Sequence, residues 1–400
     1  MENGLLILGF VFLFGFVGHI LYKTTKIPES MFLIIIGILL GPVFNVINGS
    51  FFLENAAFFL NLALVVVLLN CGLSINITKI IKTTPLAFLF TVFVLIITTG
   101  IITFVTVFFF KWSLLNGIIL GILGFGTEMI TVSHLVERLN IGENTKTLLI
   151  LESVLNDLLL IGLITVLVAI STKSAETSIL RILLDKFFLS ALLGITFAIV
   201  WLFLFIRYIH GNVLGYVFTL GACFFIFDIM DIFGFNGAIA VLIFSIALGN
   251  YKHFLKWFKN YHKFLPIEKD IVIVEDVNNQ ITFITRTLFF VFIGLVFNLK
   301  AISSQVFFFV FFISAVLILA RYLSVLLLAK IKPEYVNSVP VITAMVASGF
   351  IDTLLAFVVI RAGVNIPNLT EIILLIVILT TFAAMISAIL LEKFYHKKTY

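Results

Sequence analysis

Charged residues are scarce in this sequence: Asp, Glu, Lys and Arg make up only 11% of its 400 residues. Soluble globular domains carry about a quarter of their residues as charged ones, so this composition excludes a soluble globule. Hydrophobic residues instead reach 62%, among them 47 Phe. The composition is typical of a polytopic membrane protein, whose side chains face lipid or other helices.

The sequence has only two cysteines and none of the short motifs of nucleotide or redox enzymes. Cys71 and Cys223 lie in long apolar runs, where neither a disulfide nor a thiolate metal site is expected, so we interpret them as packing residues. There is no P-loop, HExxH, CxxC or dinucleotide fingerprint. We therefore expect neither an enzyme nor a cofactor, and the net charge of +5 requires no nucleic-acid partner.

Long apolar windows predict an all-α polytopic membrane protein. A ~30 Å hydrocarbon core needs about 20 apolar residues per helix, and the sequence contains about thirteen such windows. The predicted spans cover residues 4–22, 31–47, 57–73, 85–110, 114–136, 147–171, 186–206, 213–230, 235–250, 281–298, 303–329, 338–361 and 369–391.

The basic residues predict how the chain is oriented. Most Lys and Arg fall in alternate loops, which by the positive-inside rule face the cytoplasm. We therefore expect a multi-pass protein of the cell (inner) membrane, with the N-terminus outside and the C-terminus in the cytoplasm. Residues 251–270, YKHFLKWFKNYHKFLPIEKD, alternate basic and aromatic side chains, so we expect them to bind the cytoplasmic lipid surface.

Short matches between the two halves indicate an internal repeat. The matched elements lie an odd number of spans apart, so the two copies have opposite orientations, as in the inverted repeats of secondary transporters. The matches are Gly72-Leu73-Asn76 with Gly294-Leu295-Asn298, and Gly124-Phe125 with Gly349-Phe350.

This repeat predicts two inverted six-helix halves within a single integral membrane transporter domain, residues 1–400. The first repeat covers about 1–171 and the second about 213–392. A linker span covers about 172–212, and a short cytoplasmic tail covers 393–400.

Two spans are expected to be interrupted helices that cross at the middle of the membrane. Span 114–136 contains GIILGILGFGTEM and span 338–361 contains MVASGFIDT, each with one or more glycines shortly before polar residues. These are Thr127 and Glu128 in the first span and Asp352 and Thr353 in the second. Unwound backbone there offers carbonyl oxygens to a cation, and the ends of the half-helices compensate charge.

A second polar cluster lies in the apolar span 147–171. Glu152, Ser153, Asn156 and Asp157 share one broad helix face. A charge near the membrane centre costs at least ~2.5 kcal/mol, so such residues are retained where they face a protein interior or a watery cavity. The cluster therefore predicts a site for a small cation or a proton.

Each intramembrane charge also has a purely structural interpretation. For Asp157 we favour ion transport over a structural ion pair, whereas Glu152 has Arg321 available as a structural partner. Glu128, Asp352 and Arg286 leave two alternatives open: a second buried charge network, or direct ligation of the ion.

Three ordered motifs resemble the monovalent cation/proton antiporter superfamily, in its branch of electroneutral sodium/proton exchangers. The Glu-Ser-x-x-Asn-Asp motif is matched by the cluster at 152–157, and Gly-Ile-Leu-Leu-Gly-Pro by residues 37–42. The Ala-Arg-Pro-Leu-Ser-Val motif is matched at 320–325, with Tyr322 in place of the Pro. The resemblance covers nearly the whole chain.

The resemblance implies a homodimer with a dimerisation bundle, a mobile six-helix core and exchange of Na⁺ or Li⁺ for H⁺. Asp157 would be the carboxylate shared by cation and proton, with Asn156 and Ser153 framing the site. Thr127 would join Ser153 and Asp157 as Na⁺ ligands, and Glu128 would lie beside them. Glu152 would pair with Arg321.

The chain departs from the family's motifs at three places. Where the family has Thr-Asp-Pro, Glu128 and Met129 follow Thr127, and its Gly-Gly-Leu-Arg-Gly appears as SGFID at 348–352. Arg286 occupies a position that is uncharged in many of these exchangers.

The expected mechanism follows from one carboxylate with two possible occupants. Burial disfavours its charged form and a bound cation favours it, so proton and cation compete for Asp157. If only the neutralised site crosses the membrane, the two fluxes are coupled. Asn156 stands where electrogenic relatives have a second Asp, which implies one-for-one exchange. The alternatives are a K⁺/H⁺ antiporter of the same fold, or a cation channel or ion sensor.

Overall fold

The computed structural model describes residues 4–25, 29–47, 55–75, 85–139, 141–171, 188–209, 214–252, 267–298 and 303–396. The described residues form helices and short connections, with no β-strand among them, which confirms the predicted all-α class. Most of the predicted lipid-surface segment 251–270, and the part of the linker at 172–187, lie outside these ranges.

Eight helices in the described ranges are long and apolar enough to cross a membrane. Shorter apolar helices accompany them, such as Leu114–Gly124 and Gly237–Gly249. The chain is thus a multi-pass membrane protein, while the number of crossings and the inverted repeat stay predictions.

The chain divides into two compact units. The first comprises Met1–Ala56, Thr83–Ile164 and Thr287–Tyr400, and the second comprises Ala57–Lys82 and Thr165–Arg286. Each unit therefore combines sequence from both predicted repeats. The predicted repeats were defined by sequence matches, whereas the two units are defined by contacts between residues. The repeat boundaries therefore stay a prediction.

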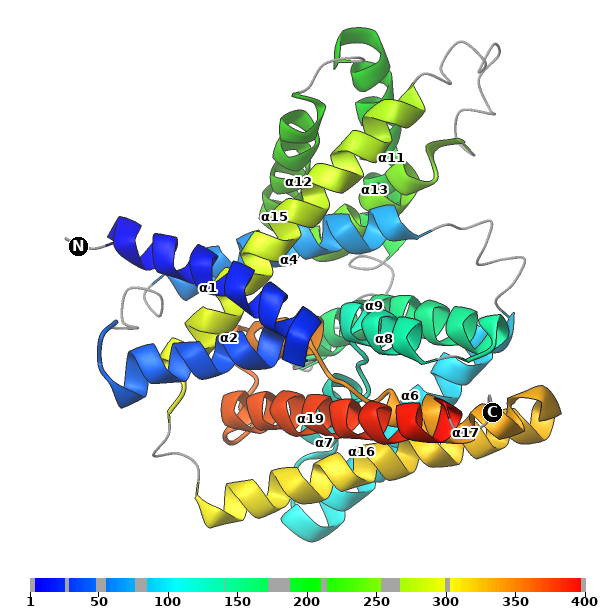
Figure 1. The fold of residues 1–400 in the computed structure, drawn as a ribbon. Helices are drawn as coiled ribbons and strands as arrows, with labels where there is room; N and C mark the ends of the chain where they lie inside the picture. Colours follow the sequence, from blue (N-terminus) through cyan, green and yellow to red (C-terminus); the bar gives the residue numbers. More distant parts are fainter. Residues whose placement is uncertain are drawn as a thin grey trace. The chain divides into compact units, whose positions relative to one another are not determined.

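The first unit contains both interrupted helices. Helix α19 packs against α16, α17 and α18, and α16 packs against α6, which also pairs with α7 (Figure 1). Its elements are α1 (Gly4–Thr25), α2 (Glu29–Ile38), η1 (Leu39–Val43), α6 (Pro85–Phe110), α7 (Leu114–Gly124), α8 (Met129–Arg138), most of α9 (Glu143–Ser171), α16 (Ser304–Ile331), η6 (Pro333–Ser338), α17 (Val339–Ala344), α18 (Phe350–Arg361) and α19 (Leu369–His396).

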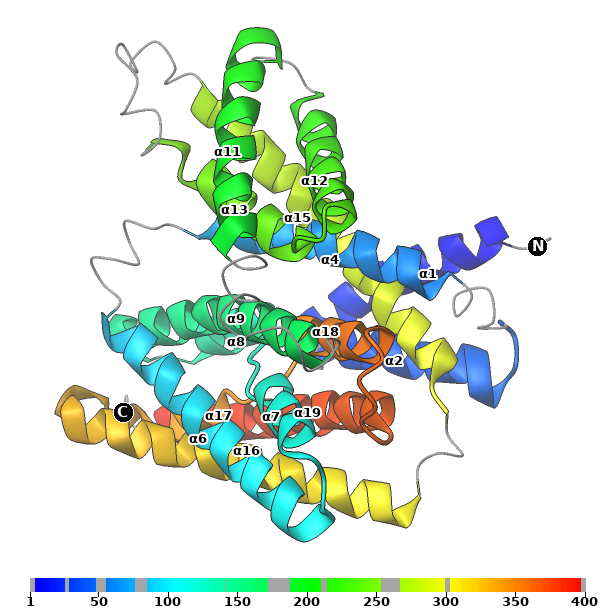
Figure 2. The same cartoon turned by 180° about the vertical axis from the view of Figure 1, so that it is seen from behind.

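The second unit is built around α13, which packs against both α11 and α12 (Figure 2). Gly194 lets α11 approach α13 closely, because a Cβ there would meet the backbone of Ala240. Its elements are α4 (Ala56–Ser74), α11 (Leu189–Leu204), η3 (Phe205–Ile209), α12 (Gly215–Ile232), α13 (Gly237–Gly249) and the first part of α15 (Ile267–Val296).

Local sequence signals explain where several helices begin. The Ser113 hydroxyl accepts the Asn116 N–H at the start of α7, and Ser303 does the same for Val306 at the start of α16. Pro85, at the first position of α6, needs no N–H partner there. Helix α15 begins at Ile267, well before the predicted span at 281, because its acidic first half lowers hydropathy without preventing helix formation.

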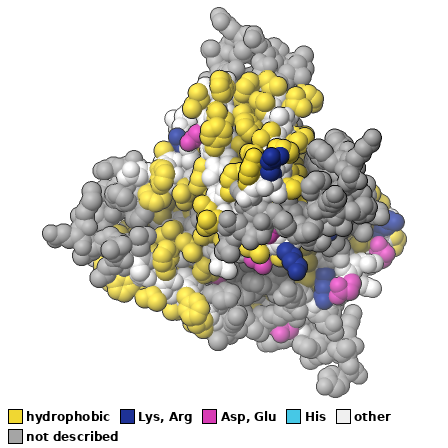
Figure 3. Space-filling view, turned by 90° about the horizontal axis from the view of Figure 1, so that it is seen from above, with side chains coloured by type: hydrophobic (Ala, Val, Ile, Leu, Met, Phe, Trp, Pro, Cys, Tyr) yellow, Lys and Arg dark blue, Asp and Glu magenta, His cyan; other side chains and the backbone are white. Residues whose placement is uncertain are grey.

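The surface is apolar, as lipid exposure requires. Large hydrophobic side chains are exposed on α16, where Phe308 is 70% and Phe311 is 60% accessible. Hydrophobic side chains cover broad areas of the face drawn in Figure 3, and charged ones are scattered. Exposure on this scale is unusual for a soluble monomer and fits a bilayer environment.

Candidate ion site

Two helices of the first unit are interrupted where the glycine clusters predict. Helix α7 ends at Gly124 and α8 begins at Met129, while α17 ends at Ala344 and α18 begins at Phe350. Each break leaves backbone groups without intrahelical partners inside an apolar environment. Polar side chains and the opposite break must therefore satisfy them.

The two breaks cross at a pair of glycines. A Cβ on Gly126 would overlap the Asp352 carboxylate, and a Cβ on Gly349 would lie 2.7 Å from Cγ of Glu128. A backbone hydrogen bond from Glu128 N–H to the Ala347 carbonyl (2.8 Å) ties the two segments together. Only glycine leaves room for the opposite acidic side chain at each of these positions.

Helix α19 and the Asp352 side chain hold the second break in place. The Ser348 N–H donates to Oγ1 of Thr380 (3.2 Å), and the Thr381 hydroxyl donates to the Ser348 carbonyl (3.3 Å). The Asp352 carboxylate accepts the Gly349 N–H (2.6 Å) and so caps α18. Asp352 thus caps a helix, one concrete role for a residue whose function the sequence left open.

The α9 cluster reaches the first break through Asn156 and Glu152. The Asn156 amide donates to the Phe125 carbonyl (3.1 Å) and to Oγ1 of Thr127 (3.0 Å). The Thr127 hydroxyl in turn donates to Oε1 of Glu152 (3.4 Å). Three of the predicted site residues are therefore in one buried hydrogen-bonded chain.

Glu152 and Arg321 form a bidentate ion pair that is almost fully buried. Arg321 donates to both Glu152 oxygens, at 3.1 and 2.9 Å, and its Nε donates to the Ile342 carbonyl (2.8 Å). The side chains are 0% and 1% exposed, and the guanidinium lies 5.7 Å from the Phe90 ring centre. The pair is neutral as a whole and joins α9, α16 and α17.

Asp157 lies on α9, as Glu152 does, and is half-buried. The acidic side chains that act on its carboxylate are those of Asp352, Glu128 and Glu152. Acidic neighbours favour a proton or a cation at Asp157.

The remaining predicted residues fall into three situations. The Ser153 hydroxyl donates to the Ile150 carbonyl of its own helix (2.9 Å), which leaves its oxygen available as an acceptor. Glu128 accepts a hydrogen bond from Thr131 (2.5 Å). Arg286 is buried on α15 in the second unit, so its proposed network with Asp352 stays a prediction.

Sequence reasoning missed Ser348, Thr380 and Thr381. All three are at most 1% exposed, and they form or support the second break. A signal was present, because two adjacent threonines in the apolar helix α19 have no packing advantage over valine. The sequence did not predict that Thr380 and Thr381 would hydrogen-bond to the backbone of Ser348.

Substituting Gly126 by alanine is expected to impair exchange and lower the melting temperature, because the new methyl group would overlap the Asp352 carboxylate. Overpacking of this kind costs ~1–3 kcal/mol. Gly162 on α9 is the matched control, since a Cβ there meets nothing within 4 Å. Melting curves and proton flux of both purified variants test the crossing, and indistinguishable variants would contradict it.

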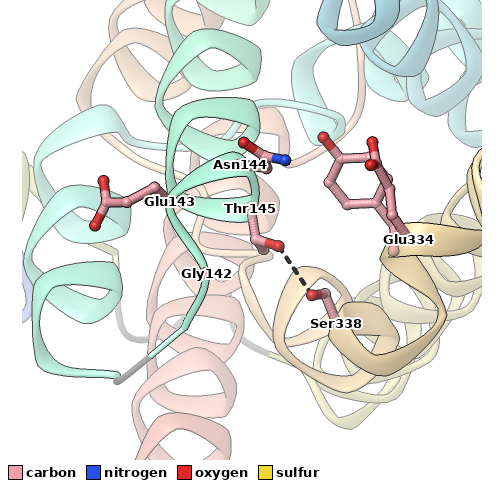
Figure 4. A pocket seen from close by; sticks show the side chains of 7 residues that line it. Gly142, Glu143, Asn144, Thr145, Glu334 and Ser338 are labelled. Atoms are coloured by element: carbon pink, nitrogen blue, oxygen red, sulfur yellow. Dashed lines mark hydrogen bonds between the residues drawn. The ribbon is translucent and has the colours of Figure 1, made fainter.

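A separate polar cavity of about 320 Å³ lies between the start of α9 and η6 (Figure 4). It contains none of the predicted ion-site residues. Burial, reinforced by the Glu334 carboxylate, raises the pKa of the Tyr335 hydroxyl in its wall. The hydroxyl oxygens of Thr145 and Ser338 are hydrogen-bonded at 2.8 Å beside this cavity. This hydrogen bond connects the start of α9 to η6.

In the described residues, no group of three or more His, Cys, Asp or Glu side chains is arranged to hold a metal ion. Among the described residues, the carboxylates at the crossing therefore do not form a set of three ligands for one metal ion. A cation bound here would need hydroxyl or carbonyl oxygens among its ligands, which suits a transported monovalent ion.

Comparison with known proteins identifies a family that this chain matches. Residues 9–393 match the family described as sodium/hydrogen exchanger, transmembrane. No curated protein sequence matches the chain.

Two solved structures of the sodium proton antiporter MjNhaP1 from Methanocaldococcus jannaschii share the fold. The structure at pH 8 is 20% identical, with a TM-score of 0.75 and coverage of 98% of this chain and 97% of that one. The electron-microscopy structure is 19% identical, with a TM-score of 0.71 and coverage of 98% and 95%. At these identities the likeness shows the fold alone.

Proposed function

The chain belongs to the sodium/hydrogen exchanger family, and from this we propose that it exchanges Na⁺ or Li⁺ for H⁺ with Asp157 as the shared binding carboxylate. Membership of this family makes the protein a transporter and not an enzyme, and its substrates are a monovalent cation and a proton. The transported ions are substrates, not cofactors.

One observation carries the proposal. Asp157 is half-buried within a membrane helix and has Asp352 and Glu128 as acidic neighbours, while Arg321 is already paired with Glu152. A carboxylate in this position is stable when a proton or a cation neutralises it. The two ions therefore compete for one place.

Each neighbouring residue has a role in this proposal. Thr127 and Ser153 contribute oxygen ligands for Na⁺, and Asn156 fixes the orientation of Thr127 through its amide. Glu128 adds negative charge near Asp157. The Glu152–Arg321 pair is structural and keeps α9 registered against α16.

Coupling arises if only the neutralised site moves between inward and outward states. We propose six helical elements of the first unit as the mobile core, namely α6, α7–α8, α9, α16, α17–α18 and α19. The second unit supplies helices for the dimerisation bundle of a homodimer. Alternating access then carries either H⁺ or the cation in each half-cycle. We propose that the protein lies in the cell membrane, with its N-terminus outside and its C-terminus in the cytoplasm.

Proton flux in proteoliposomes tests the function. Vesicles containing the purified protein are loaded with acid, and Na⁺, Li⁺ or K⁺ is added outside in turn. Alkalinisation with Na⁺ and Li⁺ but not K⁺ is expected. A response to K⁺ alone would replace the proposal with K⁺/H⁺ exchange. Cation current without proton movement would indicate a channel.

Exchange is expected to be electroneutral, because Asn156 cannot add a second titrating carboxylate beside Asp157. One uncompensated charge per cycle would add ~2.3 kcal/mol of driving force per 100 mV. Vesicles are clamped with a potassium gradient and valinomycin, and Na⁺-driven proton flux is compared at zero and inside-negative potential. Equal rates are expected. A rate that follows voltage and loses this dependence in Glu128→Gln or Asp352→Asn would contradict one-for-one exchange.

A further inference from the structure

Two adjacent threonines on α19 hold the second helix break, residues 345–349. Thr380 and Thr381 are both 0% exposed, and they bond the two backbone polar groups of Ser348. The Ser348 N–H donates to Oγ1 of Thr380 (3.2 Å), and the Ser348 carbonyl accepts the Thr381 hydroxyl (3.3 Å). One threonine therefore acts as an acceptor and the other as a donor, which a hydroxyl group can do in either sense.

The first of these hydrogen bonds ends on a peptide group that also holds Glu128. A peptide group is planar, so its carbonyl and its N–H turn together. The Ser348 N–H and the Ala347 carbonyl belong to one such group, and this carbonyl accepts the Glu128 N–H (2.8 Å). The hydrogen bond to Thr380 therefore fixes the orientation of the carbonyl that holds Glu128 in the first break.

The next peptide group connects Thr381 to Asp352 in the same way. At one edge of this group the Ser348 carbonyl accepts the Thr381 hydroxyl. At its other edge the Gly349 N–H donates to the Asp352 carboxylate (2.6 Å). Rotation of this peptide group would break both hydrogen bonds, so Thr381 fixes the donor that orients the Asp352 side chain.

The directions of these hydrogen bonds require hydroxyl groups at both positions. The Thr380 hydroxyl donates its own proton to the Ile376 carbonyl (2.7 Å), so its oxygen faces Ser348 as an acceptor. The proton of Thr381 goes to Ser348 instead. Valine has nearly the same shape as threonine, but at either position it would leave a buried backbone group of Ser348 without its partner.

The residues reached through these peptide groups belong to the proposed ion site. Glu128 and Asp352 are among the acidic neighbours of Asp157. The Glu128 N–H also shares its peptide group with the carbonyl of Thr127, whose hydroxyl accepts the Asn156 amide on α9 (3.0 Å). Hydrogen bonds and planar peptide groups therefore connect α19 to both breaks and to α9.

We infer that Thr380 and Thr381 are positioning residues for ion exchange. They orient the two peptide groups that hold Glu128 and Asp352 at the crossing. The inference rests on the proposed function, because it gives α19 a part in the affinity of the site at Asp157. Without either hydroxyl, one peptide group can turn, and the acidic residue that it holds no longer keeps its place in the site. Na⁺ then binds more weakly.

Na⁺-driven proton flux in proteoliposomes measures this role as the Na⁺ concentration that gives the half-maximal rate. Thr380→Val and Thr381→Val are each expected to raise this concentration roughly three- to tenfold, the equivalent of one lost hydrogen bond. Thr380→Ser and Thr381→Ser keep the hydroxyl and should restore the wild-type value. Thr91→Val on α6 is the matched control, since among the described residues this buried hydroxyl bonds only the Ala87 carbonyl of its own helix (2.8 Å).

Hydrogen exchange tests the same connection without transport. In Thr380→Val the backbone amide of Glu128 should exchange faster than in wild type, because the carbonyl that it bonds is no longer held. Mass spectrometry of peptides that cover residues 124–131 detects this change, and Thr91→Val should not show it. Thr381→Val leaves a carbonyl unpaired and not an N–H, which is the milder defect, so it keeps the test available if Thr380→Val does not fold.

The outcomes separate the positioning role from the proposed function. Folded valine variants with the wild-type Na⁺ dependence and wild-type hydrogen exchange would overturn the positioning role, even if they melt at a lower temperature. Serine variants that behave like the valine variants would also overturn it. Wild-type protein without Na⁺-driven proton flux would instead defeat the proposed function, while hydrogen exchange would still decide whether α19 holds the first break.

Discussion

Asp157→Asn is expected to reduce Na⁺-driven proton flux to the level of empty vesicles while the protein stays folded. The substitution preserves volume and removes the only carboxylate that we assign to both ions. An amide neither releases a proton at physiological pH nor offers full negative charge to Na⁺. The protein would therefore lose both the proton and the cation half of the cycle. Removing one negative charge from a cluster of acidic side chains should not lower stability.

The measurement is proton flux in acid-loaded proteoliposomes, together with a melting curve of the same preparation. Asp228→Asn on α12 is the matched control, because it is the same substitution at an exposed position. The control should exchange at the wild-type rate. Normal flux from well-folded Asp157→Asn would show that another group carries the proton, and Asp157 would lose its central role.

Glu152→Gln is expected to lower stability far more than any change at an exposed carboxylate. It strands the Arg321 guanidinium, 1% exposed, without its partner. Breaking a buried ion pair from one side costs ~3–5 kcal/mol, because a charge remains in a low-dielectric environment. Thr127, which donates to the same carboxylate, would also lose a charged acceptor. The purified variant should melt several degrees below wild type.

Two further variants separate the ion pair from general disturbance. Glu143→Gln changes the same residue type on the same helix, in an exposed pair with Lys146 (2.9 Å). Exposed pairs contribute at most ~1 kcal/mol, so its melting temperature should hardly change. The double variant Glu152→Gln, Arg321→Gln should recover part of the loss. Equal melting of wild type and Glu152→Gln would refute the structural role.

The sequence alone determined the class of the protein, and it singled out the residues that we propose as the ion site. Apolar windows and scarce charge dictate membrane helices, because hydrophobic length is a local property of the chain. Gly124, Gly126 and Gly349 indicated both helix breaks, since glycine weakens a helix wherever it is found. The polar cluster at 152–157 stood out for the same local reason, namely its cost in lipid.

Some expectations were beyond what local signals can decide. The start of α15 lay well before the apolar window, because hydropathy reports burial in lipid and not helix formation. The predicted repeat pairs Gly124 with Gly349, yet Gly124 ends α7 whereas Gly349 precedes α18. The helices beside the two breaks differ in length, so short sequence matches cannot align the first break with the second residue by residue.

Only the tertiary structure decided which polar groups meet. Gly126 with Asp352, Gly349 with Glu128, and Ser348 with Thr380 and Thr381 are contacts between segments far apart in the chain. Sequence reasoning left Asp352 open between an ion pair and a ligand, whereas the fold makes it the cap of α18. The physical reason is that hydropathy and glycine content act within one helix. Hydrogen bonding and steric fit at a crossing depend on two helices at once.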